Sequence, residues 1–347
     1  MKKWLIGLSI VLVLAGGWVM HLMWVAGELD TLEPHFAGEC TEVDGVIGAE
    51  DIVIHPTGGV AFVSAADRRA FRNGGSPRGG IYLYGLDDRE LRNITPGASP
   101  AFQPVGLSLH VGRDGRTTLM AVSYEDGEPT VGVYDWLGGA LIQRRAIADP
   151  LMISPNDLHA LDHERFFVTN DHANPPGFWR TVEEYFRLEI SNVLYYDGSR
   201  FQEAVGGIAM PNGVNASPDG KRLYVASTLG GSIHVFDLDF STGTLAAKDR
   251  IEIDSGVDNI DVDTEGRLWV AAHPKLLTFV RHASDPTVLS PSQVLRVDPK
   301  SRNVDEVYLE LGSAMSGSSV AAFHDGRMLI GTVLDRRFLD CRFGDSG

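Results

Sequence analysis

The chain has 347 residues, of which 44% are hydrophobic, so it can bury a sizeable core as one large domain or two small ones. Its 39 glycines and 17 prolines favour many short strands and tight turns over a helical bundle. The formal net charge of −16 argues against nucleic-acid binding, which needs a basic surface, and is compatible with carboxylates gathered around a cation.

Lys2 and Lys3 precede an uncharged apolar run from Trp4 to Val25. As a helix this run is about 33 Å long, enough to cross a bilayer. It is longer than a signal-peptide core and continues past Ala15-Gly16-Gly17, which resembles a cleavage site. We therefore predict an uncleaved signal-anchor over residues 1–27, with a cleaved signal as the alternative. The lysines favour a cytoplasmic amino terminus, which leaves residues 28–347 outside the cytoplasm, in a periplasm, an endomembrane lumen or the extracellular space.

Two cysteines, Cys40 and Cys341, lie near the two ends of the region that follows the apolar run. They are either two buried free thiols or disulfide partners. The export segment, the even count and the terminal placement favour a disulfide. Such a bond would close a loop of about 300 residues, and the chain-entropy gain for that length is at most about 5 kcal/mol.

From about Gly45 onward, short apolar or alternating runs recur, for example at residues 60–64, 223–226 and 268–271, and each is typical of a strand. Turns such as Pro218-Asp219-Gly220-Lys221 lead into them. The combination returns at intervals of roughly 45–55 residues, which is the spacing of propeller blades, and gives about six units. We predict an all-β, six-bladed β-propeller. A β-sandwich or two small β domains are the alternatives, but the period persists to the end and no linker divides the chain.

One stretch departs from the strand pattern. After Pro175-Pro176-Gly177, the large apolar residues between Phe178 and Leu188 alternate with charged ones at helical spacing, which predicts an amphipathic helix over a channel mouth. Its aromatic side chains have three possible roles: they pack as a cap, line a substrate pocket, or dip into a membrane near the anchor.

Pairs of polar residues stand directly before the first strand of several units. The pairs are Glu50-Asp51, Asn156-Asp157, Asn212-Gly213 and Asp258-Asn259. In a propeller the innermost strand of each blade lines the axis, so the ends of these strands converge. Carboxylate and amide oxygens suit calcium, which accepts about 6–8 oxygen ligands, whereas zinc prefers histidine or thiolate.

With these motifs the chain resembles the paraoxonase (serum paraoxonase/arylesterase) family from Cys40 to Cys341. The related gluconolactonase and strictosidine-synthase-like propellers share only part of the set. The matching segments are Ala49-Glu50-Asp51-Ile52, Pro155-Asn156-Asp157, Thr169-Asn170-Asp171-His172, Asn212-Gly213-Val214-Asn215 with the turn that follows it, Val257-Asp258-Asn259-Ile260, Leu268-Trp269-Val270 with His273-Pro274, and Leu329-Ile330-Gly331-Thr332-Val333.

The resemblance implies a six-bladed propeller whose terminal strands close the ring, with two calcium ions in the axial tunnel. It also implies a Cys40–Cys341 disulfide and a retained amino-terminal anchor. Carried over by position, the catalytic calcium would be held by Glu50, Asn156, Asn212, Asp258 and Asn259. The deeper, structural calcium would be held by Asp51, Asp157 and the backbone oxygen of Leu107.

The chain departs from the family at the histidine pair that is often assigned as the base. The two positions hold Val105 and Tyr124. Valine has no proton chemistry, and a tyrosine with a pKa near 10 is a poor base. Asp171, His273 and the ligand Glu50 are the remaining candidates for the base.

The resemblance therefore implies a calcium-dependent hydrolase of lactones and of aryl or alkyl esters, acting on a small hydrophobic substrate whose carbonyl the metal polarises. The alternative is a catalytically weak or inactive calcium-stabilised propeller that binds a small hydrophobic ligand or a partner protein. Loss of both histidines favours the alternative, while the complete set of metal positions favours the hydrolase.

Overall fold

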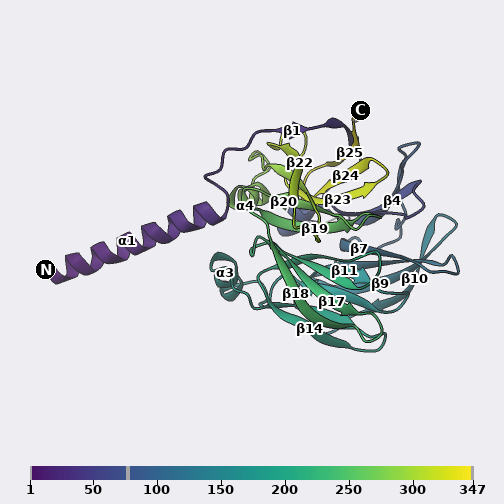
Figure 1. The fold of residues 1–347 in the computed structure, drawn as a ribbon. Coiled ribbons are helices and arrows are strands. Elements are labelled where there is room, and N and C mark those ends of the chain that lie inside the picture. The colour runs from purple at the N-terminus through teal and green to yellow at the C-terminus, as the bar shows by residue number, and fades with distance from the viewer. Residues whose placement is uncertain (1, 76–78, 345–347) are drawn as a thin grey trace.

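The computed structural model describes residues 2–75 and 79–344, which form six β-sheets and four α-helices. The sheets follow one another in chain order, and the innermost strand of each contacts that of the next. The last inner strand, β23 (Ser318–His324), contacts the first, β3 (Ala49–Ile54), so the sheets close into a ring. Figure 1 shows one rounded body from which a single helix projects. The predicted six-bladed β-propeller is confirmed.

Each of the first three blades contains four strands, running outward from the axis in chain order. The first blade is β3, β4 (Val60–Ala65), β5 (Gly80–Gly85) and β6 (Leu91–Asn93). The second is β7 (Gln103–Val111), β8 (Thr117–Glu125), β9 (Glu128–Leu137) and β10 (Ala140–Ile147). The third is β11 (Pro155–Ala160), β12 (Phe166–Asn170), β13 (Ser191–Tyr196) and β14 (Phe201–Ile208).

The last three blades follow the same plan, with additions from the amino-terminal part of the chain. The fourth is β15 (Pro211–Ala216), β16 (Arg222–Ser227), β17 (Ser232–Asp239) and β18 (Thr244–Glu252). The fifth is β19 (Gly256–Val262), β20 (Leu268–His273), β21 (Ser292–Val297) and β22 (Val304–Glu310), with β1 (His35–Phe36) at its edge. The sixth is β23, β24 (Arg327–Thr332), β25 (Arg337–Phe343) and β2 (Gly38–Asp44).

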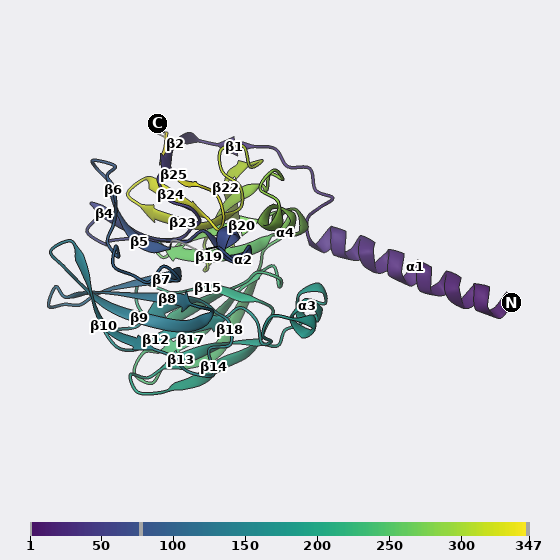
Figure 2. The same ribbon diagram turned by 180° about the vertical axis from the view of Figure 1, so that it is seen from behind.

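The ring is closed by strands from the two ends of the propeller. Strand β2 pairs antiparallel with β25, and this register places Cys40 opposite Cys341. The two cysteines form a disulfide bond. Figure 2 shows β2 and β25 together beside the carboxyl terminus. Both the closure by terminal strands and the disulfide are confirmed.

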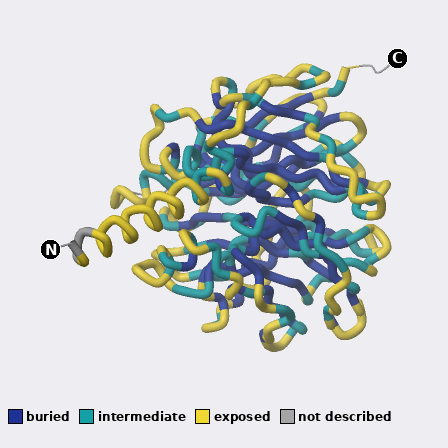
Figure 3. The backbone as a smooth tube through the Cα atoms, turned by 60° about the vertical axis from the view of Figure 1, so that its left-hand side comes forward, coloured by how far each residue is buried: buried dark blue, intermediate teal, exposed yellow. Residues whose placement is uncertain are grey.

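Strand β16 illustrates why these sequences form blades. Leu223 and Val225 pack in one buried cluster with the third blade, and Tyr224 and Ala226 pack in another with the fifth. Successive side chains of a strand point to opposite faces, and here neighbouring blades cover both faces. A continuous apolar run therefore forms a strand that is buried on both sides (Figure 3).

The amino-terminal helix α1 (Lys2–Val25) extends away from the propeller, and its residues 6–21 are exposed (Figures 1 and 3). Within it, Ile6–Val25 has a mean hydropathy of 2.0 and none of its most apolar window is buried. By length and composition this helix can cross a membrane, as the sequence predicts.

Three short helices lie among the blades. Helix α3 (Phe178–Tyr185) occupies the stretch with the predicted amphipathic helix. Phe178 and Trp179 on it are 73% and 67% exposed, so these two aromatics do not pack as a cap over the channel. Helices α2 (Arg68–Arg72) and α4 (Leu276–Ser284) were not expected from the sequence. In Figure 1, α3 and α4 lie on the side of the propeller that faces α1.

Candidate metal centre

All six innermost strands carry an irregularity at the same place. The pairing of each inner strand with the second strand of its blade shifts register near the start of the strand. Such bulges re-aim side chains and are common beside functional sites. The residues left unpaired are Glu50, Val105 with Gly106, Asn156 with Asp157, Asn212 with Gly213, Asp258 with Asn259, and Ser319. The shifts therefore coincide with most of the predicted calcium ligands.

Two glycines among these residues allow neighbouring inner strands to approach closely. A Cβ atom at Gly106 would lie 2.5 Å from the Cα and Oδ1 atoms of Asp157. A Cβ atom at Gly213 would lie 2.6 Å from the Cα atom of Asn259. Only glycine fits such a backbone approach, so both positions bring predicted ligands of the next blade toward the axis.

Carboxylates connect one blade to the next around the tunnel. Asp51 Oδ2 accepts a hydrogen bond from the backbone N–H of Leu107 at 2.6 Å. Asp157 Oδ2 accepts one from the N–H of Val214 at 2.8 Å. The two acids predicted to hold the deeper ion thus also join the first blade to the second and the third to the fourth. The third residue predicted for that ion, Leu107, is itself buried against Asp51.

Predicted ligands of the outer ion from the first and fifth blades lie side by side. Asn259 Nδ2 lies 3.4 Å from the backbone oxygen of Glu50 and 3.5 Å from its Oε1. Ser319 Oγ donates to the same backbone oxygen at 2.6 Å, and Asn212 Nδ2 donates to Thr228 Oγ1 at 3.3 Å. The fifth blade contributes Asp258 beside Asn259.

Several oxygens in this set are buried and accept no hydrogen bond from the residues described. They are Glu50 Oε2 and the Oδ1 atoms of Asn156, Asp157, Asn212 and Asn259. A buried acceptor left without a partner costs about 1–3 kcal/mol, so each of these five oxygens calls for a compensating partner. All five are carboxylate or amide oxygens, which are the donors that calcium prefers. The residues present therefore fit a calcium site.

The donor set does not suit a metal that prefers nitrogen or sulfur. Within residues 2–75 and 79–344, no three His, Cys, Asp or Glu side chains are grouped so that they alone could hold a metal ion. The predicted site instead depends on the amides of Asn156, Asn212 and Asn259. A hard cation that accepts amide oxygens matches this composition better than zinc does.

The carboxylates of the site are strongly perturbed. The pKa of Glu50 is raised to about 8, mainly by burial; the charge of Arg68 opposes this rise, and the charges of Asp51 and Asp258 contribute to it. Burial likewise raises the pKa of Asp51 to about 7, and raises that of Asp157 well above its usual range. Crowded buried carboxylates resist ionisation unless a cation compensates them.

The two positions of the family's histidine pair belong to the wall between the second and third blades. Val105 and Tyr124 pack against a buried apolar cluster there. Tyr124 Oη donates to the backbone oxygen of Pro155 at 2.8 Å, directly before the predicted ligand Asn156. Burial, followed by the charge of Asp171, raises the pKa of Tyr124 above its ordinary value. Tyr124 therefore supports the strand that carries Asn156, and its raised pKa makes it a poor base.

His273 is the base candidate that touches the predicted ligands. It is the last residue of β20 and is 2% exposed. Its Nε2 atom lies 2.8 Å from Asp258 Oδ2, and its ring stacks on Phe279 of α4 with 3.8 Å between centroids. Its Nδ1 atom is buried and has no hydrogen-bond partner among the residues described.

Asp171 is engaged elsewhere. Its Oδ1 atom lies 2.7 Å from Nδ1 of His172, whose Nε2 is 3.1 Å from Oε1 of Glu184 on α3. Burial lowers the pKa of His172, but the bonds to both carboxylates outweigh it and raise that pKa to about 9. In the described part of the chain, no hydrogen bond or ion pair joins Asp171 to a predicted calcium ligand. Of the three base candidates, Glu50 and His273 lie together with the ligands.

Arg68 is a residue of the site that the sequence analysis missed. Its Nη1 donates to the backbone oxygens of Gly48 and Val333 at 3.0 and 3.3 Å, and its Nη2 donates to that of Pro104 at 3.0 Å. Gly48 lies just before β3 of the first blade, and Pro104 lies in β7 of the second. Val333 directly follows β24 of the sixth blade. The guanidinium therefore ties three blades together at the mouth.

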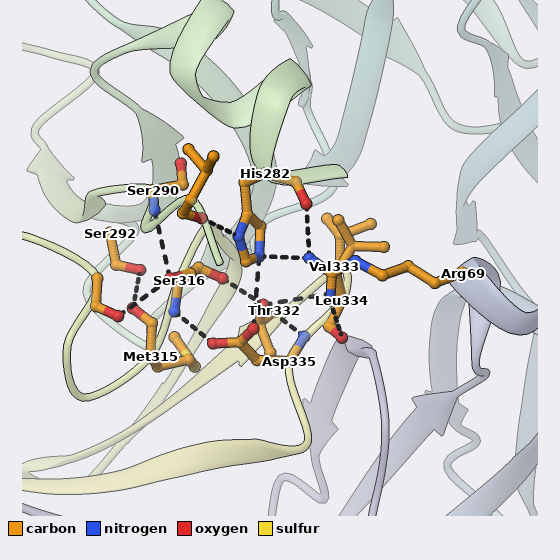
Figure 4. Close-up of polar contacts among 12 residues, drawn as sticks. Arg69, His282, Ser290, Ser292, Met315, Ser316, Thr332, Val333, Leu334 and Asp335 are labelled. Carbon is orange, nitrogen blue, oxygen red and sulfur yellow. Dashed lines mark hydrogen bonds and ion pairs between the residues drawn. The ribbon is translucent and has the colours of Figure 1, made fainter. Parts of the chain in front are cut away.

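Arg69, the next residue of α2, holds this helix in place. Figure 4 shows Arg69 reaching from α2 toward His282 of α4 and the segment after β24. Its Nη2 donates to the backbone oxygen of His282 at 2.7 Å, and its Nη1 donates to that of Leu334 at 3.2 Å. The ring of His282 lies 3.4 Å from Asp335, which accepts from the N–H of Ser316. This polar cluster fixes α2 and α4 relative to each other over the mouth.

Replacing Arg68 with methionine is expected to lower the free energy of unfolding by about 3 kcal/mol, because several backbone carbonyls lose their donor. Denaturant unfolding of the calcium-saturated protein measures this loss. Arg72→Met, at the exposed end of the same helix, is the matched control and is expected to stay within about 0.5 kcal/mol of the parent. Equal losses in the two variants would contradict the role assigned to Arg68.

Comparison with known proteins agrees with this geometry. Residues 32–343 match the family model described as Arylesterase. Serum paraoxonase/arylesterase 1 of Rattus norvegicus is 34% identical over 314 residues, which cover 86% of this chain and 87% of that protein. Serum paraoxonase/arylesterase 2 of Homo sapiens is 31% identical over 350 residues, which cover 95% of this chain and 96% of that protein.

A solved structure resembles the chain in fold. It is regucalcin from Agrobacterium tumefaciens, described as a calcium-binding protein, with a TM-score of 0.56 and 15% sequence identity. The similarity covers 90% of this chain and 97% of that one. At this level of identity, the likeness concerns the propeller fold alone.

Proposed function

Because the chain belongs to the arylesterase family, we propose that it is a calcium-dependent hydrolase of lactones and of aryl or alkyl esters. Membership in that family makes it a carboxylic-ester hydrolase. The observation that carries the calcium proposal is the group of five buried oxygens, from the first, third, fourth and fifth blades, that accept no hydrogen bond among the residues described. Family membership supports hydrolysis over the alternative of an inactive ligand-binding propeller.

In this proposal two calcium ions occupy the tunnel. The outer ion is held by Glu50, Asn156, Asn212, Asp258 and Asn259, and the deeper ion is held by Asp51, Asp157 and the backbone oxygen of Leu107. When bound, the outer ion supplies Lewis-acid polarisation of the substrate carbonyl and stabilises the oxyanion. The blade-to-blade hydrogen bonds of Asp51 and Asp157 support the structural role given to the deeper ion.

We assign the proton transfer to His273. Its Nε2–H can donate to Asp258, which leaves the unpartnered Nδ1 as a proton acceptor. A carboxylate that orients an imidazole in this way fixes its tautomer and its direction. Stacking on Phe279 holds the ring in place. The outer ligand Glu50 is the second candidate, and Asp171 is the weakest because of its pairing with His172.

His273→Gln is expected to lower kcat by roughly 100-fold or more, the usual contribution of a general base. Asp171→Asn is the matched comparison and is expected to change kcat by less than about 3-fold. Calcium affinity is measured in both variants, because His273 also contacts the ligand Asp258. Full activity in His273→Gln, with calcium affinity unchanged, would exclude His273 and leave Glu50.

A substrate panel tests the proposed function itself. Aliphatic lactones and phenyl acetate are assayed with the full chain in calcium, after chelation, and after calcium is restored. Turnover that disappears on chelation and returns with calcium is expected. If no substrate shows chelator-sensitive turnover, the inactive ligand-binding propeller becomes the better description.

We further propose that α1 anchors the propeller in a membrane, outside the cytoplasm. The exposed apolar length of α1 and the disulfide, a bond typical of oxidising compartments, support this placement. Trp18 of α1 and Phe186 at the end of α3 lie 5.4 Å apart, so the exposed aromatics of α3 are positioned to meet the bilayer surface. Resistance of the protein to extraction by salt, but not by detergent, is the expected result.

A further inference from the structure

The polar cluster between α2 and α4 joins the two helices that flank the predicted metal centre (Figure 4). On α4, Phe279 stacks on His273, and His282 lies one turn further along the same helix. On α2, Arg68 ties three blades together, and its neighbour Arg69 reaches His282. A change in the bonding of His282 therefore acts on both sides of the mouth.

The hydrogen bonds of the His282 ring determine where its proton lies. The residue is 1% exposed, and both ring nitrogens have partners. Nδ1 lies 2.6 Å from the backbone oxygen of Val288, which can only accept, so Nδ1 carries the proton. Nε2 lies 2.9 Å from Nη2 of Arg69, which can only donate, so Nε2 is the acceptor. The neutral ring satisfies both contacts at once.

A charged ring cannot keep the contact with Arg69. A second proton, taken from water, turns Nε2 into a donor that faces another donor, and the two cations then repel each other. Asp335 offers the alternative partner, because its Oδ1 lies 3.4 Å from Nε2 of His282. Burial alone would raise the pKa of Asp335, but its contact with His282 and the bond from the N–H of Ser316 outweigh burial and lower that pKa. Protonation therefore replaces Arg69 with the ionised Asp335 as the partner of the ring.

Four further charged side chains lie around this contact, and none of them bonds to the ring in the described part of the chain. They are Asp67 and Arg72 of α2, Asp285 at the end of α4, and Arg281 within α4. The first three act on Arg69 through their charges, whereas Arg281 is bonded to Thr278. Arg69 and Asp335 are thus the charged groups that face His282 from the elements packed against it.

We propose that His282 is a positioning residue whose protonation releases Arg69 and thereby loosens α2 over the metal centre. Arg69 then keeps only its bonds to the backbone oxygens of His282 and Leu334. Arg68, the preceding residue, is held less firmly beside Glu50, so the mouth is less well ordered in acid. The effect on turnover rests on the proposed ester or lactone hydrolysis, but the loosening of α2 does not.

Hydrogen exchange of the full chain, saturated with calcium in detergent, tests the loosening directly. The readout is the protection of the hydrogen-bonded amides within residues 70–75, corrected for the intrinsic effect of pH on exchange. In the parent, this protection is expected to fall by about tenfold or more between about pH 8 and about pH 5, because one bond to a charged group is lost. Protection that does not change over this range overturns the proposal.

Two variants separate this role from a purely structural one. His282→Gln keeps an acceptor toward Arg69 that takes up no proton in this range, so the acid-induced fall in protection is expected to disappear. Asp335→Asn removes the counter-charge of the protonated ring, so the fall is expected to move to lower pH. His324→Gln, at the end of β23 away from the mouth, is the matched control and is expected to follow the parent.

The kcat for phenyl acetate, measured over the same pH range, links the loosening to turnover. It is expected to fall less steeply toward acid in His282→Gln than in the parent, while groups of the metal centre titrate in both and cancel in the comparison. A pH response of α2 that His282→Gln abolishes supports the proposal even if no ester is turned over. The same pH course of protection in the parent, His282→Gln and Asp335→Asn overturns it.

Discussion

Chelation of calcium is expected to lower the unfolding temperature of the protein by about 10 °C near pH 8, and by much less near pH 5. An ion present at a thousandfold its Kd contributes about 4 kcal/mol of stability. In a large domain, each kcal/mol of unfolding free energy shifts the unfolding temperature by about 2–4 °C. The five oxygens without donors would become uncompensated once the ions are removed.

The pH dependence comes from the buried carboxylates. Burial raises the pKa of Glu50 to about 8 and that of Asp51 to about 7, whereas unfolded carboxyls titrate near pH 4. Between these values the folded, metal-free chain holds more protons than the unfolded chain. The stabilisation that comes from these extra protons is therefore complete below about pH 4 and is lost as the pH rises through about 8. Bound calcium keeps the carboxylates charged, so the calcium-loaded protein is expected not to show this loss.

Thermal unfolding with and without chelator, between about pH 5 and about pH 8, measures this effect. Calcium is expected to restore stability, and magnesium is expected to restore less, because it demands a stricter geometry. In the metal-free state, Glu50→Gln is expected to flatten the pH dependence, whereas Glu128→Gln at an exposed position is not. A metal-free protein that becomes more stable toward alkaline pH would contradict the calcium assignment.

Replacing both cysteines with alanine is expected to lower the free energy of unfolding by about 5 kcal/mol at most. The bond between Cys40 and Cys341 closes a loop with a sequence separation of 301, so it removes much conformational freedom from the unfolded chain. The hydrogen bonds between β2 and β25 remain in the variant, so the native ring is still expected to form.

Denaturant unfolding of Cys40→Ala/Cys341→Ala gives the size of this contribution. Reduction of the parent protein is the control and is expected to produce the same midpoint, because both treatments remove one bond. An unchanged midpoint after either treatment would show that the ring is held together by strand pairing alone. The double substitution avoids a single free thiol that could pair between molecules.

The sequence predicted the fold well because the relevant signals are local. Alternating apolar runs, Asp-Gly turns and a repeat of roughly constant length recur along the chain, and each depends on neighbouring residues only. The predicted ligands could also be located, because Glu50, Asn156, Asn212 and Asp258 each lie near the start of an inner strand, where an unpaired polar residue is unusual. The bulges explain why these residues tolerate the position.

Other parts of the site depend on contacts between distant segments and had no local signal. Arg68 follows Asp67 and precedes Arg69, a run that is typical of an exposed turn, yet it donates to carbonyls of three blades. From the sequence, Asp171 was a candidate because it follows a strand end, and His273 because it was expected on the rim of the tunnel. Only the tertiary structure shows that one reaches Asp258 while the other pairs with His172.

The pairing of β2 with β25 also sets the order in which the polypeptide can mature. Residues 38–44 leave the ribosome before any blade is complete, but their partners at residues 337–343 leave it only after the other strands of the propeller. Until then, one edge of β24 presents backbone N–H and C=O groups that have no strand partner. Such edges pair readily with other chains. A fold with many contacts between distant segments closes slowly, so a chaperone that shields the open ring would help it. Truncation near the carboxyl terminus would therefore act on assembly and yield before it acted on catalysis.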